Sequence, residues 1–156
     1  MEVYHTSNVR VEQPDTHHSR KDLDFGTGFY FTTLRPQTEK YAFRFFKRQE
    51  TAWLNIYDFV DDWRDWKVKT FDEYDEEWLD FIVACRAGNM AGEYDMVVGG
   101  IADDKVFDTL NLFFDDFIQK DEALRRLAYE KPNIQYCIRT ESMIKKCLTF
   151  KDCIQL

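Results

Sequence analysis

The sequence lacks the marks of a membrane protein and of a secreted, disulfide-bonded one. No apolar run approaches the length that spans a bilayer, and no basic segment followed by an apolar core begins the chain, so we expect a cytoplasmic protein with no membrane partner. The cysteines show no Cys-x-x-Cys spacing, which disfavours disulfides and favours free, buried thiols. They are Cys85, Cys137, Cys147 and Cys153.

Positive charge, low-complexity tracts and internal repeats are also scarce. The 156 residues include 21 Lys and Arg against 29 Asp and Glu, which gives a formal net charge of −8. Binding to nucleic-acid backbones depends on clustered Lys and Arg, so this charge disfavours a general nucleic-acid binder but leaves room for a local basic groove. With 44% hydrophobic and 17% aromatic residues, residues 1–156 are expected to form one domain with a sizeable core.

Hydrophobic periodicity predicts short strands mixed with helices. The segment 75–86 has the clearest helical pattern, with Trp78, Phe81, Ile82 and Cys85 at spacings of three to four residues. Because strands and helices do not alternate regularly, the fold class predicted is α+β rather than a parallel doubly wound sheet. Strands are expected at 3–5, 29–32, 52–59, 94–98, 134–138 and 148–156, and helices at 37–48, 75–86, 105–118, 122–129 and 141–147.

The stretch from Arg20 to Thr33 is the most informative part of the chain. Its run Gly26-Thr27-Gly28-Phe29-Tyr30-Phe31 predicts a tight turn that leads into a strand and holds Tyr30 at a fixed place. Earlier in the chain, His5-Thr6-Ser7 places a ring nitrogen, hydroxyls and backbone amides at the end of a short strand. Together the two segments predict a site for a planar, polar ligand.

This combination resembles the ADP-ribosyltransferase superfamily of the diphtheria-toxin and poly(ADP-ribose) polymerase type. There, a His-Gly-Thr/Ser motif and a Gly-x-Gly-x-Tyr-Phe motif on successive strands grip the nicotinamide end of NAD. The superfamily also carries a hydroxyl residue and a second tyrosine eight and eleven residues after the strand tyrosine. In this chain those positions hold Thr38 and Tyr41.

The chain resembles still more closely a bacterial group known as domain of unknown function family 3990. That group has a Gly-Phe-Tyr-Leu-Thr-Thr core, and three further patterns of the group recur here in the same order. They are Trp78-Leu79-Asp80-Phe81-Ile82, the segment from Tyr94 to Asp104, and Gln135-Tyr136-Cys137-Ile138-Arg139-Thr140. Matches that spread over nearly the whole chain are more specific than one glycine motif.

The resemblance implies an ADP-ribosyltransferase-like split β-sheet core with peripheral helices, NAD as co-substrate and no metal. Tyr30 and Tyr41 would sandwich the nicotinamide ring by offset stacking. The backbone of Thr6 and the hydroxyl of Thr38 would bind the carboxamide, and His5 would bind the adenosine ribose. The implied NAD-binding set is His5, Thr6, Ser7, Gly28, Tyr30, Thr38 and Tyr41.

Gln135 stands where the polymerases carry their catalytic glutamate, and it completes the implied catalytic set with Tyr30 and His5. Its amide can orient a ribose hydroxyl, but it is neutral and cannot stabilise a developing cation as a carboxylate does. This departure favours mono-ADP-ribosyl transfer over polymer synthesis. Slow NAD hydrolysis and a silent module that binds NAD, ADP-ribose or a protein stay open. Candidate replacement carboxylates are Asp103, Asp104 and Glu141.

Several of these residues also have structural interpretations. Tyr30 suits a strand core, Thr38 and Tyr41 suit an amphipathic helix, and Asp103 suits a helix N-terminus. The macromolecular acceptor stays open between protein and nucleic acid. The family resemblance suggests a bacterial or phage setting with a small antitoxin or regulatory protein, for which the acidic segment 58–65, with Trp63 and the adjacent Trp66, is a candidate surface.

Overall fold

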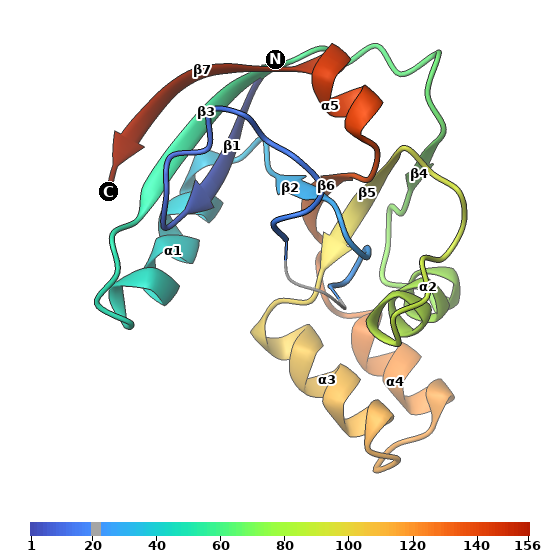
Figure 1. Ribbon diagram of the computed structural model, residues 1–156. Helices are drawn as coiled ribbons and strands as arrows, with labels where there is room; N and C mark the ends of the chain where they lie inside the picture. Colours follow the sequence, from blue (N-terminus) through green and yellow to red (C-terminus); the bar gives the residue numbers. More distant parts are fainter. Residues whose placement is uncertain (20–22) are drawn as a thin grey trace.

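Two β-sheets form the centre of the computed structural model, which describes residues 1–19 and 23–156 (Figure 1). Residues 20–22 of the Arg20–Thr33 stretch lie outside the described part. The first sheet is antiparallel, with β3 (Trp53–Phe59) between β1 (Glu2–Ser7) and β7 (Leu148–Gln155). The second has the order β2 (Phe29–Phe31), β6 (Asn133–Ile138), β5 (Met96–Ile101) and β4 (Val68–Thr70), and only the β4–β5 pair in it is parallel.

The two sheets meet where β1 passes β2. The backbones of Tyr4 and Thr32 exchange two hydrogen bonds there, of 2.8 and 3.0 Å, in an isolated antiparallel bridge. Apolar side chains then fill the space between the sheets. This core includes Val3, Phe29, Tyr57, Met96 and Ile138, all at most 5% exposed. Buried aromatic and aliphatic side chains therefore pack beside the junction.

The helices divide between the sheets. Helix α1 (Arg35–Phe46) packs against β1 and β3 of the first sheet. The helices α2 (Glu76–Arg86), α3 (Asp104–Phe114) and α4 (Lys120–Leu127) gather beside the second sheet, and α5 (Glu141–Cys147) connects β6 to β7 (Figure 1). Trp78 of α2 is fully buried in this second core and satisfies its indole N–H by donating to the Gly100 carbonyl at 2.8 Å.

The α+β class and most elements expected from the sequence are confirmed, with shifts of one to four residues at the ends. Strand β4 was missed, because a three-residue strand after the acidic segment 58–65 has no readable alternation. Thr140 does occupy the N-cap of α5, but its hydroxyl donates to the Asp95 carboxylate at 3.1 Å rather than capping the helix. Contacts between distant segments thus determine the hydrogen bond of Thr140, and the local sequence does not reveal them.

The cysteines are free as expected, and three of them are buried. The expectation of burial was wrong for Cys153, which is partly exposed on β7. In the described part of the chain no helix is long and apolar enough to cross a bilayer. The cytoplasmic location stays a prediction.

Candidate functional site

The His5 ring lies at the junction of the two sheets. Its Nδ1 is 2.6 Å from the Tyr30 carbonyl oxygen, and its ring packs at a tilt on Phe29 with centroids 4.5 Å apart. A carbonyl only accepts hydrogen bonds, so Nδ1 carries the proton and Nε2 of the neutral ring is an acceptor. Burial lowers the pKa of His5, which favours this neutral form.

Tyr30 points to the opposite side of β2 from Phe29 and closes the glycine turn. Its hydroxyl donates to the Gly26 carbonyl at 2.5 Å and accepts from the Phe25 N–H at 3.1 Å. Its ring lies nearly parallel to that of Phe25, with centroids 6.3 Å apart. Burial raises the pKa of Tyr30 far above its usual value, so the phenol stays neutral. The residue therefore has the core role that the sequence left open, whatever it does for a ligand.

The two glycines of the turn have separate reasons to be glycine. Gly26 has a φ of +80°, which disfavours other residues. Gly28 has no such constraint, but a Cβ there would lie 2.5 Å from Cys137 Sγ and 2.6 Å from the Ile138 carbonyl oxygen. Gly28 thus permits close approach of β2 to β6, and its N–H donates to Ser19 Oγ at 3.2 Å.

Thr6 and Thr38 lie in contact, and both hydroxyls donate to backbone carbonyls. The Thr6 hydroxyl donates to the Thr38 carbonyl at 3.0 Å, while the Thr38 hydroxyl donates to the Arg35 carbonyl at 2.5 Å. Tyr41, one turn further along α1, is 36% exposed and has the Arg44 guanidinium 4.8 Å from its ring centroid. Ser7 accepts a local hydrogen bond from the backbone N–H of Val9 at 3.3 Å. The Tyr41 ring thus makes its contact with Arg44 on α1, whereas the Tyr30 ring makes its contact with Phe25 at the glycine turn.

Gln135 lies on β6, opposite Gly99 of β5. Cys137, two residues further along β6, is the register partner of Tyr30, and residues two apart in a strand share a face. Gln135 and Tyr30 are therefore on the same face of the second sheet. The Gln135 side chain is half-buried, and no described residue makes a hydrogen bond to its amide.

Two of the three alternative carboxylates, Asp103 and Glu141, have structural partners. Asp103 accepts from the Val106 N–H at 3.1 Å and caps α3, so the helix-start interpretation is confirmed. Glu141 accepts from the N–H and hydroxyl of Thr16 at 2.7 and 2.8 Å and lies 3.5 Å from His17 Nε2. The hydrogen bonds from Thr16 lower the pKa of Glu141.

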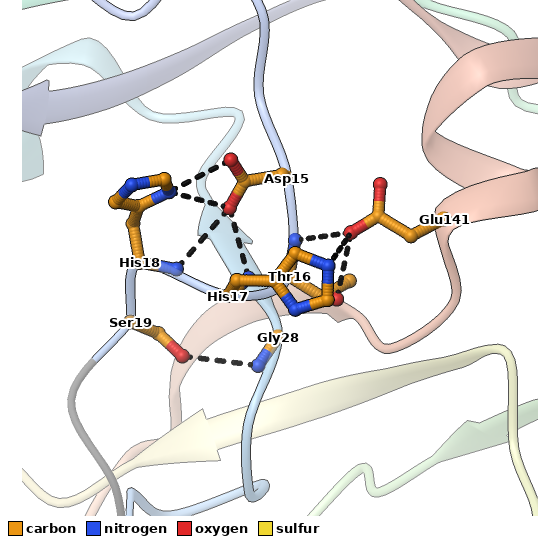
Figure 2. A network of polar contacts seen from close by, with 7 residues as sticks. All are labelled: Asp15, Thr16, His17, His18, Ser19, Gly28 and Glu141. Carbon is orange, nitrogen blue, oxygen red and sulfur yellow. Dashed lines mark hydrogen bonds and ion pairs between the residues drawn. The ribbon is translucent and has the colours of Figure 1, made fainter.

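Figure 2 shows that this Glu141 contact belongs to a network that fixes the loop before the glycine turn. Asp15 accepts from the backbone N–H groups of His17 and His18 and pairs with the His18 ring at 2.7 Å. Ser19 completes the network through its hydrogen bond with Gly28. His17 and His18 act here as structural loop residues.

Two residues that hold the turn were missed from the sequence. The Asp24 carboxylate accepts from Arg86 of α2 at 2.8 and 2.5 Å and from the Ala102 N–H at 2.9 Å. Arg139, just after β6, donates to the Phe25 carbonyl at 2.9 Å. No local pattern announces these contacts, because their partners are 62 to 114 residues apart in the chain.

Outside the implied NAD-binding set, the described residues include a surface depression and the acidic segment 58–65. A half-open depression of about 570 Å³ between α2 and α4 contains no residue of the implied NAD-binding set. In the described ranges, no three His, Cys, Asp or Glu side chains gather as a metal site. In the segment 58–65, Trp63 packs against the inter-sheet core, while Asp58, Asp61, Asp62 and Asp65 are exposed.

The structure thus defines an α+β protein whose two sheets meet beside the motif residues His5 and Tyr30. The family described as "Protein of unknown function (DUF3990)" matches residues 1–150, and the chain belongs to this family. The resemblance to that group seen in the motifs is confirmed. Neither the curated proteins nor the solved structures that were searched gave a match.

Proposed function

We propose that the protein is an NAD-dependent mono-ADP-ribosyltransferase with an ADP-ribosyltransferase-like split sheet. The observation that carries the proposal is the junction of β1 and β2, where the His5 ring bonds the backbone of Tyr30. Gln135 lies on the same sheet face as Tyr30 and has no hydrogen-bond partner among the described residues. The His5 ring packs on Phe29, which points to the other face of β2, so the backbone of β2 links His5 to the face that carries Tyr30 and Gln135.

The reaction breaks the bond between the ribose anomeric carbon and nicotinamide, which leaves as a neutral ring with the bonding electron pair. A new bond forms from that carbon to an acceptor oxygen or nitrogen, which loses its proton to solvent. The transition state carries positive charge on the ribose, so the protein must hold the leaving ring and fix the ribose. Tyr30 and Tyr41 would contact the ring, and His5 Nε2 would accept from an adenosine ribose hydroxyl.

Gln135 would position a ribose hydroxyl through its amide oxygen. Because the amide is neutral, it gives less stabilisation to the developing cation than a carboxylate would. We therefore expect slow turnover and single transfers rather than chain growth. The acceptor would be a macromolecule, and a small antitoxin or regulatory protein would restrain the activity.

A silent module that binds NAD, ADP-ribose or a partner protein is the second candidate. It is favoured by the neutral Gln135 and by the structural partners of Asp103 and Glu141, which leave neither carboxylate free to replace a glutamate. NAD binding without nicotinamide release would support this candidate over the transferase.

Incubation with NAD labelled in the adenylate, together with cell lysate, tests the proposal. We expect free nicotinamide and label in either the protein or the nucleic-acid fraction, with both signals lost in Tyr30→Ala if that variant stays folded. Thermal denaturation with NAD checks binding separately, since a ligand of the folded state raises the midpoint. A midpoint shift without nicotinamide release would replace the transferase by the silent module, and the absence of both would reject NAD as the ligand.

A further inference from the structure

Helix α1 and the turn after it are basic in an otherwise acidic chain. Residues 35–48 contain five Lys or Arg residues and one Glu, whereas the whole chain has a formal net charge of −8. In the described part of the molecule only Arg35 of these five has a carboxylate within 4 Å, namely Glu39 at 3.5 Å. The four cations without such a partner are Lys40, Arg44, Lys47 and Arg48, and all are exposed.

The same helix exposes aromatic rings. Phe43 is 61% exposed, Phe46 is 42% exposed, and their rings meet edge to face with centroids 5.9 Å apart. Only Thr38 and Ala42 of α1 are buried against the sheet. The exposed rings therefore add little to the core, and their exposure costs the hydrophobic free energy that burial would provide.

Cations and rings form an ordered pattern around the helix. At 3.6 residues per turn, Lys40, Arg44 and Lys47 follow one stripe on the outward side. Phe43 and Phe46 flank this stripe on one side, and Tyr41 flanks it on the other, with the Arg44 guanidinium 4.8 Å from its centroid. The result is a basic stripe about 10 Å long between two sets of rings.

We propose that this outward face of α1 binds single-stranded nucleic acid. A row of cations neutralises the phosphates of one strand, while rings beside it stack with unpaired bases, and the two together are the means by which proteins hold single strands. A duplex keeps its base faces covered, so these rings would find nothing to stack on. A lipid surface would need a continuous apolar face, whereas the outward face of α1 carries the exposed cations Lys40, Arg44 and Lys47 between its rings.

The location links this surface to the proposed reaction. Tyr41 borders this surface and also belongs to the implied NAD-binding set, so a strand on α1 would contact a residue of that set. The strand would then be the ADP-ribosyl acceptor, through a base nitrogen or a hydroxyl that loses a proton as nicotinamide leaves. This acceptor role rests on the proposed transferase function, whereas the binding itself does not.

Fluorescence anisotropy with a labelled 20-nucleotide oligothymidylate, and with single-stranded RNA of equal length, tests the binding at several salt concentrations without NAD. The first variant is Lys40→Glu/Arg44→Glu. Its control, Lys105→Glu/Lys131→Glu, makes the same change of net charge at exposed positions that have no described ion pair. A third variant, Phe43→Ser/Phe46→Ser, removes the rings alone, and circular dichroism checks that all variants fold.

We expect the Lys40/Arg44 variant to lose at least about 10-fold in affinity and its salt slope to shrink by about 1.4, since each neutralised phosphate contributes about 0.7 on a single strand. The Phe43/Phe46 variant should weaken binding about 10-fold or more with an unchanged slope. Binding that the Lys105/Lys131 control weakens equally, no binding of either strand, or preference for phosphatidylserine vesicles or duplex overturns the proposal.

Labelled NAD added to the bound strand separates the two claims. Label on the oligonucleotide supports the acceptor role, and nicotinamide release with an unlabelled oligonucleotide overturns it. If the strand binds through α1 but no nicotinamide is released with any acceptor, the transferase function fails while the binding surface stands.

Discussion

At the scale of single residues, Gly28 belongs both to the glycine motif and to a close strand pairing. Its lack of a side chain lets β2 approach β6 beside Cys137 and Ile138. A motif match therefore identifies a position that the fold needs as well. Loss of function on substitution of such a residue is informative only when stability is measured in parallel.

Gly28→Ala should lower the free energy of unfolding by about 1–3 kcal/mol, because the new methyl overpacks a backbone contact. Urea denaturation measures this change. Thr27→Ala, in the same turn but exposed, is the matched control and should change stability by about 0.5 kcal/mol or less. Equal stability of the Gly28 variant and the wild type would show that β2 and β6 are further apart than described.

The neutral His5 ring predicts a pH dependence. Burial lowers the pKa of His5 in the folded state, so the unfolded state binds the proton more readily. The contribution of His5 to stability is thus complete above the unfolded pKa of about 6.5 and is lost as the pH falls below it. Unfolding free energies measured from pH 8 to pH 5 should fall less steeply in His5→Asn than in the wild type. An equally steep fall in His5→Asn, or an equal flattening in the control His17→Asn, would contradict the assignment.

At the scale of elements, helix ends show which carboxylates are structural. Asp103 caps α3 and Glu141 fixes the loop of Figure 2, although both seemed open to a catalytic role in the sequence. Asp103→Ala should cost about 1 kcal/mol of stability, because an N–H at the start of the helix loses its acceptor.

Nicotinamide release should stay at the wild-type level in Asp103→Ala. Asp104→Ala, in the exposed first turn of the same helix, is the control and should cost less, since it loses only the dipole term of about 0.3–1 kcal/mol. A large loss of turnover in Asp103→Ala with little loss of stability would return Asp103 to the catalytic candidates.

At the scale of the whole molecule, the fold class and nearly all elements followed from periodicity, because the apolar spacing of helices such as α2 is a local property. The family followed from motifs that occur in the right order. What connects the elements did not follow: the Tyr4–Thr32 bridge, the Asp24–Arg86 pair and the contacts of Arg139 join distant segments. Likewise, the formal net charge of −8 gave no indication of the basic face of α1.

The NAD-binding role of the motif residues stays a prediction. The structure shows that the His5 ring contacts the Tyr30 carbonyl and that the Thr6 hydroxyl donates to the Thr38 carbonyl. The sequence did not reveal that the Tyr30 hydroxyl closes the turn, since that role depends on the path of the backbone at Phe25 and Gly26. Nor did the sequence reveal that the Gln135 side-chain amide has no hydrogen-bond partner among the described residues.

Nicotinamide release from NAD by the wild type, Gln135→Ala and Gln135→Glu, compared at equal NAD occupancy, tests the central claim most directly. The wild type should release nicotinamide slowly. Gln135→Ala should lose this release with about 1 kcal/mol or less of change in stability, because a half-buried polar side chain without described partners contributes little to folding. Gln135→Glu should be faster, since its carboxylate stabilises the developing cation. No release by the wild type with NAD bound, or full release by Gln135→Ala, would contradict the account.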